Sequence, residues 1–348
     1  MKTKAIALVR HGEATNAFQE IEINLPEITS NQVLVAVDAF GLNYAEVMAR
    51  KGLYGDAPPF PAVLGYEVVG TIIETGSNLD ISLIGKRILA FCRFGGYAKH
   101  VIVEEFAFVE LGDYETGKAL ALATQYVTAY YMVERVANVQ RGERVLIHAA
   151  AGGVGTALIQ LCKRKGAIVF GKVSSNSKAE QIKQQGADEA IVYTTSDYEE
   201  TISRQLNGKY LDVSFNPVAG STTKKDARLL GSGSRLVLFG GSELGNARFG
   251  IFSKLNFVRK MGLVIPIGLM MKSKSVLGVN MLRIADDKPE VLKTCLQEVV
   301  KMAMEGAIYP QVGGIYSAQD LARAHADLES GKTIGKLVIE WSPSLDKA

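Results

Sequence analysis

Residues 144–165 read RVLIHAAAGGVGTALIQLCKRK, and this stretch decides the fold. Residues 144–148 have the compact aliphatic pattern of a strand covered on both faces, and an apolar helical pattern begins just after Gly155. Between them lie small residues that let the backbone turn tightly and let a pyrophosphate approach the start of the helix. A second strand at 167–173 completes a βαβ unit. The pattern predicts a dinucleotide site, with an ordinary tight turn as the alternative, and its contacts are Ala151, Gly152, Gly153, Val154 and Gly155.

The end of the second strand indicates which nucleotide is bound. A site for NAD usually has Asp or Glu about twenty residues past the glycines, where it binds the ribose hydroxyls. Residues 171–178 read GKVSSNSK and contain no acidic residue. The hydroxyls of Ser174 and Ser175 and the ammonium groups of Lys172 and Lys178 suit a 2′-phosphate instead. We therefore expect NADPH to be preferred over NADH; the alternative for this segment is a solvated polar loop.

The order of the predicted elements divides the 348 residues into two domains. A β-rich segment comes first, with strands at 4–10, 32–40, 63–75, 87–91 and 97–103. After an apolar helical pattern at 120–136, strands alternate with helices, at 144–148, 168–173, 190–193, 212–216, 235–239 and 276–280. This alternation predicts an α/β fold with a doubly wound parallel sheet. The tail, from residue 281, has a helix, a short strand, a second helix at 318–330 and a last strand at 336–341.

Composition indicates a small-molecule partner. Lys and Arg number 39 against 36 acidic residues, a balance that does not predict a nucleic-acid partner. The three cysteines are widely spaced, so they indicate neither a disulfide framework nor a thiolate metal cluster. No secretory signal is visible, and a reducing, cytoplasmic location is expected.

Residues 8–16, LVRHGEATN, resemble the start of the histidine phosphatases. In that family the asparagine falls seven residues after the arginine, whereas Asn16 falls six after Arg10. A phosphatase would also not explain the βαβ unit. We interpret the stretch as a polar turn that joins two amino-terminal strands.

Several longer motifs resemble the medium-chain dehydrogenase/reductase superfamily, quinone oxidoreductase type, close to the vesicle amine transport protein homologue branch. They are AFGLNYAEVMARKGLY at 39–54, PPFPAVLGYEVVG at 58–70, HAAAGGVG at 148–155, VSSNSK at 173–178 and GKTIGKLVI at 331–339. The resemblance implies a GroES-like β-rich catalytic domain at 1–123 and 281–348. It implies a Rossmann cofactor domain at 124–280.

The resemblance also implies that catalysis does not use zinc. Asn43 and Tyr66 stand where zinc-dependent relatives carry a cysteine and a histidine, and the four-cysteine lobe for a structural zinc is missing. Without a metal, an alcohol is hard to oxidise, whereas a quinone or an α,β-unsaturated carbonyl accepts hydride directly. By resemblance the catalytic residues are Asn43, Tyr54 and Thr128, with Tyr54 as hydrogen-bond donor to the developing oxyanion. The alternatives are that Asn43 only stabilises its loop through hydrogen bonds to the backbone and that Tyr54 is a half-exposed aromatic residue at the rim of the pocket.

Further cofactor contacts follow from the resemblance and from the positions of predicted strand ends. Ser174 and Lys178 match positions around the 2′-phosphate, Tyr193 matches an aromatic beside it, and Lys336 resembles the family's cleft lysine. Residues at the carboxyl ends of later strands, where a doubly wound sheet places its ligand, are Asn216, Phe239, Gly240 and Asn280.

Residues 249–274 form an apolar insertion that charges and Pro266 interrupt, so a membrane-spanning helix is excluded. Three roles are left open: a lid over the substrate, a dimer surface, or a patch that contacts a membrane surface. A homodimer is expected through the sheet edge at 276–279. The alternative function is a nucleotide-binding association protein with little turnover.

Overall fold

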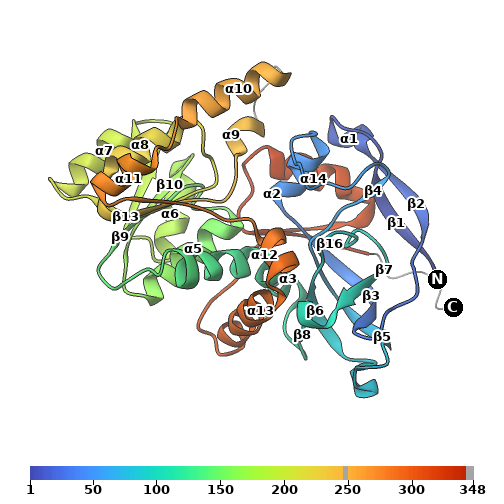
Figure 1. Cartoon of the computed structure of the whole chain (residues 1–348). Coiled ribbons are helices and arrows are strands. Elements are labelled where there is room, and N and C mark those ends of the chain that lie inside the picture. Colours follow the sequence, from blue (N-terminus) through green and yellow to red (C-terminus); the bar gives the residue numbers. More distant parts are fainter. Residues whose placement is uncertain (246–249, 342–348) are drawn as a thin grey trace. The chain divides into compact units, whose positions relative to one another are not determined.

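The structure is a computed structural model that describes the backbone of residues 1–245 and 250–341, and it divides into two compact units (Figure 1). Unit 1 contains Met1–Val127 and the tail that begins at Met281, and unit 2 contains Thr128–Asn280. The tail therefore folds with the amino-terminal segment Met1–Val127.

Unit 2 is built on a six-stranded parallel sheet in the order β11-β10-β9-β12-β13-β14. The strands are β9 (Arg144–Ile147), β10 (Ile168–Val173), β11 (Glu189–Val192), β12 (Leu211–Asn216), β13 (Leu230–Leu238) and β14 (Ser275–Gly278). The order reverses between β9 and β12, and a doubly wound sheet binds its ligand beyond the strand ends at such a point. The predicted α/β class is confirmed.

Four helices connect the strands. They are α5 (Gly153–Arg164), α6 (Asn176–Gln184), α7 (Tyr198–Leu206) and α8 (Ser221–Leu229). Two of them, α5 and α7, bury a mainly apolar face. In α7, Tyr198, Ile202 and Leu206 recur at helical spacing and pack with Leu146 and Phe170 in one core. Asp197 caps the start of α7, where its carboxylate accepts from the Glu199 and Glu200 N–H groups, and Asn207 caps the end in the left-handed region.

The insertion folds as two helices, α10 (Gly250–Met261) and α11 (Pro266–Lys272), and α10 packs against α8. The short helix α9 (Ser242–Gly245) precedes the insertion. Residue 249 and the side chains of residues 250–252 and 254 lie outside the described part. Several described side chains leave apolar surface exposed, among them Leu255 at 63%, Leu263 at 87% and Met271 at 81%. Among the residues that the structure describes, no helix has the length and apolar character needed to cross a membrane.

Unit 1 contains a sheet in the order β15-β16-β3-β5-β6-β8, with β7 also paired to β3, and a smaller sheet in the order β2-β1-β4. The strands are β1 (Lys2–Leu8), β2 (Phe18–Asn24), β3 (Gln32–Leu42), β4 (Ala62–Val63), β5 (Glu67–Thr75), β6 (Arg87–Phe91), β7 (His100–Glu104), β8 (Phe108–Glu110), β15 (Val312–Ser317) and β16 (Lys336–Glu340). The helices are α1 (Ala14–Ala17), α2 (Tyr44–Arg50), α3 (Thr116–Ala121), α12 (Met281–Asp287), α13 (Pro289–Met304) and α14 (Leu321–Glu329). Because β16 pairs with β3, the last strand of the chain completes the first domain.

Element boundaries differ from the predictions where the backbone turns. The predicted strand 63–75 divides into β4 and β5, because Gly65 has a positive φ of 106°. The predicted helix 120–136 is α3 followed by π-helical turns at Leu122–Tyr126 and Tyr131–Val136, on either side of α4 (Val127–Tyr130). The RHGE stretch joins β1 to β2 through the short helix α1, as the turn interpretation requires.

The glycine-rich stretch turns more tightly than predicted. Strand β9 ends at Ile147 rather than His148, Ala149 has a φ of 49°, and α5 begins at Gly153 rather than after Gly155. A β carbon added at Gly155 would lie 2.7 Å from the Cα atom of Ala150, which is backbone and cannot move independently. Gly155 is therefore required by the close approach of the helix to the turn.

We expect Gly155→Ala to lower the free energy of unfolding by about 1 to 3 kcal/mol, because the added methyl group forces the turn and α5 apart. The matched control is Gly268→Ala in α11, where an added β carbon meets no atom within 4 Å. Urea unfolding followed by circular dichroism measures both. Equal stability of the two variants would contradict the packing argument.

Candidate functional site

The glycine-rich turn places an uncovered helix start at the carboxyl end of the central strand of unit 2. Gly152 caps α5, and the first turn of this 12-residue helix contains no acidic side chain. Ala151 and Gly155 are buried, and Gly152, Gly153 and Val154 are partly exposed. The helix dipole and the N–H groups of this turn can hold a phosphate or pyrophosphate.

The predicted 2′-phosphate residues come together at the ends of β10 and β11. Ser175 caps α6, and its hydroxyl accepts from the Lys178 N–H group. Tyr193 follows β11, where its N–H group donates to the carbonyl of Val173 at 3.1 Å, and its side chain is 48% exposed. Thr194 donates from Oγ1 to the carbonyl of Ser174 at 3.0 Å, which ties the two strand ends together. Ser174, Ser175, Lys178 and Tyr193 thus share one corner of the sheet edge.

The remaining predicted residues of unit 2 divide into two kinds. Asn216 is buried: its Oδ1 atom accepts from the N–H groups of Val218 and Ala219 at 2.9 and 2.8 Å, so it shapes the loop after β12. Phe239 is partly exposed and Gly240 exposed just after β13, and Asn280 is exposed after β14. Thr128 lies on α4 and is half-buried. The amide of Asn216 is therefore structural, whereas Phe239, Gly240 and Asn280 stay accessible at the sheet edge.

A buried polar cluster under the glycine-rich turn was missed by the sequence predictions. The carboxylate of Asp226, on α8, lies 3.0 Å from His148 Nε2 and accepts from Tyr198 at 2.9 Å and from Ser214 at 2.8 Å. Burial alone would raise the pKa of Asp226, but His148 and the hydrogen bonds hold it below its usual value. Asp226 lies on the same face of α8 as the buried residues Thr222 and Leu229. An acidic residue on the inner face of a helix was the signal for this cluster.

The sequence predicts that the Lys172 side chain is a ligand of the 2′-phosphate, and this prediction is wrong because the side chain is buried. Only 7% of Lys172 is exposed, and its Nζ atom lies 3.4 Å from His148 Nδ1. The side chain points into the polar cluster because it leaves β10 on the face that α7 and α8 cover.

In unit 1, the predicted Asn43 and Lys336 meet at a carboxylate that sequence reasoning did not select. Glu67, at the start of β5, forms an ion pair with Lys336 and accepts from Asn43 Nδ2 at 2.9 Å, and all three side chains are buried. Lys336 Nζ also donates to Asn43 Oδ1 at 2.9 Å, and Thr124 donates to Glu67. The signal was a charged residue inside the apolar strand pattern at 66–72, which requires a buried partner.

A second buried carboxyl group lies beside this ion pair. Glu46, on α2, is fully buried, and its Oε2 atom accepts from the Asn43 N–H group at 2.5 Å. Burial, and then the charge of Glu67, raise the pKa of Glu46 to about 8, so the group is protonated at neutral pH. The cluster therefore contains one carboxylate, one ammonium and one neutral acid.

Tyr54 and Tyr66 provide phenol groups in the same unit. Tyr54 is half-buried and Tyr66 is 3% exposed. Their ring centroids lie 6.5 Å apart, and the rings are in an edge-to-face (T-shaped) arrangement. Burial raises the pKa of both phenols, so both remain protonated donors over the physiological range. In the part of the chain that the structure describes, no three His, Cys, Asp or Glu side chains are grouped as metal ligands.

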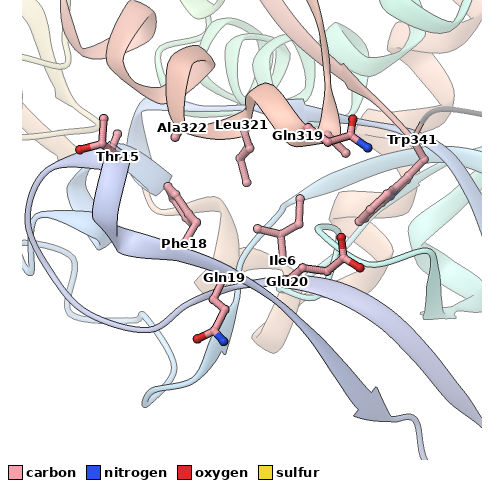
Figure 2. A pocket seen from close by; sticks show the side chains of 11 residues that line it. Ile6, Thr15, Phe18, Gln19, Glu20, Gln319, Leu321, Ala322 and Trp341 are labelled. Atoms are coloured by element: carbon pink, nitrogen blue, oxygen red, sulfur yellow. The ribbon is translucent and has the colours of Figure 1, made fainter.

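A separate hollow of about 360 Å³ lies between the smaller sheet and α14 of unit 1 (Figure 2). Ile6, Phe18, Leu321 and Trp341 contribute its apolar lining, and Gln19, Glu20 and Gln319 contribute polar groups at its rim. None of the predicted site residues lines it. It is therefore distinct from both clusters.

Two family models match parts of the chain. Residues 29–113 match the model of the alcohol dehydrogenase GroES-like domain, and residues 185–339 match that of zinc-binding dehydrogenases. The chain is 30% identical over 317 residues to the human synaptic vesicle membrane protein VAT-1 homolog, covering 90% of this chain and 79% of the relative. It is 27% identical over 342 residues to a rat quinone oxidoreductase, covering 97% of each.

Solved structures give the same result. The Escherichia coli quinone oxidoreductase complexed with NADPH superposes with a TM-score of 0.84 at 26% identity, covering 97% of this chain and 99% of that one. A mycobacterial protein complexed with NADPH superposes with a TM-score of 0.83 at 26% identity over the same shares. A GroES-like domain joined to a doubly wound parallel sheet defines a class of dehydrogenases and reductases. The chain belongs to the medium-chain dehydrogenase/reductase family, in the branch that contains the quinone oxidoreductases and the VAT-1 homologues.

We expect Lys336→Met to destabilise the protein by about 3 to 5 kcal/mol, because it leaves the buried carboxylate of Glu67 without its ammonium partner. The double variant Lys336→Met with Glu67→Gln should lose clearly less than the sum of the two single variants. Urea unfolding of the four proteins measures this coupling. Strictly additive losses would contradict an ion pair.

The raised pKa of Glu46 also predicts a pH dependence of stability. Between about pH 4.5 and pH 8 the folded protein keeps a proton on Glu46 that the unfolded chain releases, so the free energy of unfolding falls as pH rises. Glu46→Gln is neutral at every pH and keeps an oxygen for the Asn43 N–H group. The variant should gain stability relative to the wild type as pH rises from 5 to 8, measured by urea unfolding. A constant difference over that range would show that Glu46 is ionised in the folded protein.

Proposed function

We propose that this chain is a zinc-independent, NADPH-dependent oxidoreductase that transfers hydride to a quinone or an α,β-unsaturated carbonyl. The observation that carries the proposal is the sheet edge of unit 2, where the small-residue turn and the group Ser174, Ser175, Lys178 and Tyr193 lie with no acidic residue at the end of β10. Two solved structures of the same fold are of proteins complexed with NADPH.

The residues present fit this cofactor. The start of α5 offers N–H groups to a pyrophosphate, and side chains no larger than valine leave the backbone accessible there. Lys178 and the hydroxyls of Ser174 and Ser175 suit the charge of a 2′-phosphate. Phe239, Gly240, Asn280 and Thr128 are proposed to contact the remainder of the cofactor. When bound, NADPH supplies the hydride.

The donor set of unit 1 favours reduction of an activated acceptor. The amide of Asn43 is engaged by Glu67 and Lys336, and Tyr66 offers a phenol in place of an imidazole. Such a set does not supply the thiolate and imidazole ligands of a catalytic zinc. Tyr54 keeps its proton because burial raises its pKa, and we propose that it donates a hydrogen bond to the oxygen that gains charge. In this proposal Glu67 holds the side chains of Asn43 and Lys336, and Lys336 is available to bind the cofactor only when its ion pair with Glu67 is broken.

A second candidate is a nucleotide-binding protein that acts by association. The exposed apolar side chains of α10, α11 and the segment between them favour it, since Leu255, Leu263 and Met271 are each more than half exposed. The same surface also suits a lid or a homodimer contact next to β14, the edge strand of the sheet. Turnover separates an enzyme from an association protein.

The test is NADPH oxidation by the purified protein with a panel of quinones, enals and enones, with and without a chelator. We expect turnover that the chelator leaves unchanged, and Tyr54→Phe should lower kcat by about 10²-fold with little change in the KM for NADPH. His11→Ala is the control and should keep full activity. NADPH binding without turnover of any acceptor would favour the association protein, and one bound zinc per chain would contradict zinc-independent catalysis.

A further inference from the structure

Lys172 is a buried lysine with no carboxylate in direct contact among the described residues. It forms no ion pair with any described carboxylate, and its nearest polar contact is His148 Nδ1 at 3.4 Å. The nearby carboxylate of Asp226 is occupied by donors from His148, Tyr198, Ser214 and Asn216. Burying an ammonium without a paired carboxylate is costly, so a role outside the cluster would explain its presence.

The position of Lys172 indicates that role. Its Nζ atom lies 4.7 Å from the ring centroid of Tyr193 and 4.2 Å from that of Tyr198. Tyr193 is 48% exposed and stands at the corner that also holds Ser174, Ser175 and Lys178. The charge of Lys172 therefore lies behind the aromatic side chain of the proposed phosphate corner. Lys172 itself is buried, so water screens its charge less than that of an exposed lysine.

The groups around Lys172 set its protonation. Burial lowers its pKa to about 8, although the charge of Asp226 acts in the opposite direction. The other ionisable groups that face it are the imidazole of His148 after β9, Lys225 on α8, Asp197 before α7, Glu243 on α9, and the phenols of Tyr193 and Tyr198. At pH 8 the side chain is thus a mixture of ammonium and amine, and a nearby anion shifts it toward ammonium.

We propose that Lys172 is a specificity-determining residue for the nucleotide: from behind Tyr193 it supplies a second positive charge to the 2′-phosphate and takes up a proton from solvent when NADPH binds. Lys178 contacts the phosphate, and Lys172 acts on it through space. The inference rests on the proposed use of NADPH. NADH has no 2′-phosphate, so its binding does not change the protonation of Lys172.

The test is calorimetric titration of the full-length protein with NADPH and with NADH at pH 8, in two buffers of different ionisation enthalpy. At this pH the 2′-phosphate is already dianionic, because its second pKa is about 6, and it takes up no proton itself. We expect an uptake of up to about half a proton with NADPH and none with NADH. Lys172→Met should abolish the uptake and weaken NADPH by about tenfold but NADH by less than about twofold.

Two controls separate charge from fold. Lys178→Met should weaken NADPH yet keep the proton uptake, and Lys183→Met, at an exposed lysine of the same helix α6, should change neither. NADPH binding without uptake in the wild type, or uptake retained in Lys172→Met, would overturn the role of Lys172 and leave the proposed function standing. If neither nucleotide binds, the proposed function and the inference both fail.

Discussion

The carboxylate of Asp226 joins the elements on which the cofactor corner of unit 2 depends. It accepts from His148 directly after β9, from Ser214 and Asn216 on β12, and from Tyr198 on α7. Each donor is buried, so losing the carboxylate would leave several polar groups unsatisfied together. His148 immediately precedes Ala149, where the turn adopts a positive φ. The geometry of the glycine-rich turn is thus fixed from beneath by one acidic side chain.

Each unit contains one buried ionisable group more than its neighbours can pair, an acid in unit 1 and a base in unit 2. In unit 1, Glu46 and Glu67 share one ammonium, that of Lys336, and the excess acid remains protonated. In unit 2, Asp226 is already satisfied when Lys172 is added, and the excess base has a lowered pKa. Both imbalances are resolved by a proton rather than by a counter-ion. This makes the two clusters responsive to charge that a bound molecule brings.

The fold could be predicted from sequence because its signals are local. Alternating apolar patterns and the small residues at 149–155 are sufficient for a βαβ unit, and the parallel sheet follows from repetition. The ends of elements were less certain: α5 starts at Gly153 because Gly152 can cap it, which the apolar pattern alone does not reveal. The buried clusters could not be predicted because their members come from distant parts of the chain. Lys336 and Glu67, for example, are 269 residues apart.

Two lysines that are close in the sequence, Lys172 and Lys178, have different surroundings in the structure. Both lie near the end of β10, and their residue type alone predicts the same role for them, as ligands of the 2′-phosphate. Strand alternation directs Lys172 inward from β10, whereas Lys178 lies on α6 after the Ser175 cap and stays partly exposed. A lysine that points inward does not contact the ligand directly. Its charge is screened less, however, because less water surrounds it. A phosphate-selective corner can therefore combine one lysine that touches the ligand with another that only polarises its site.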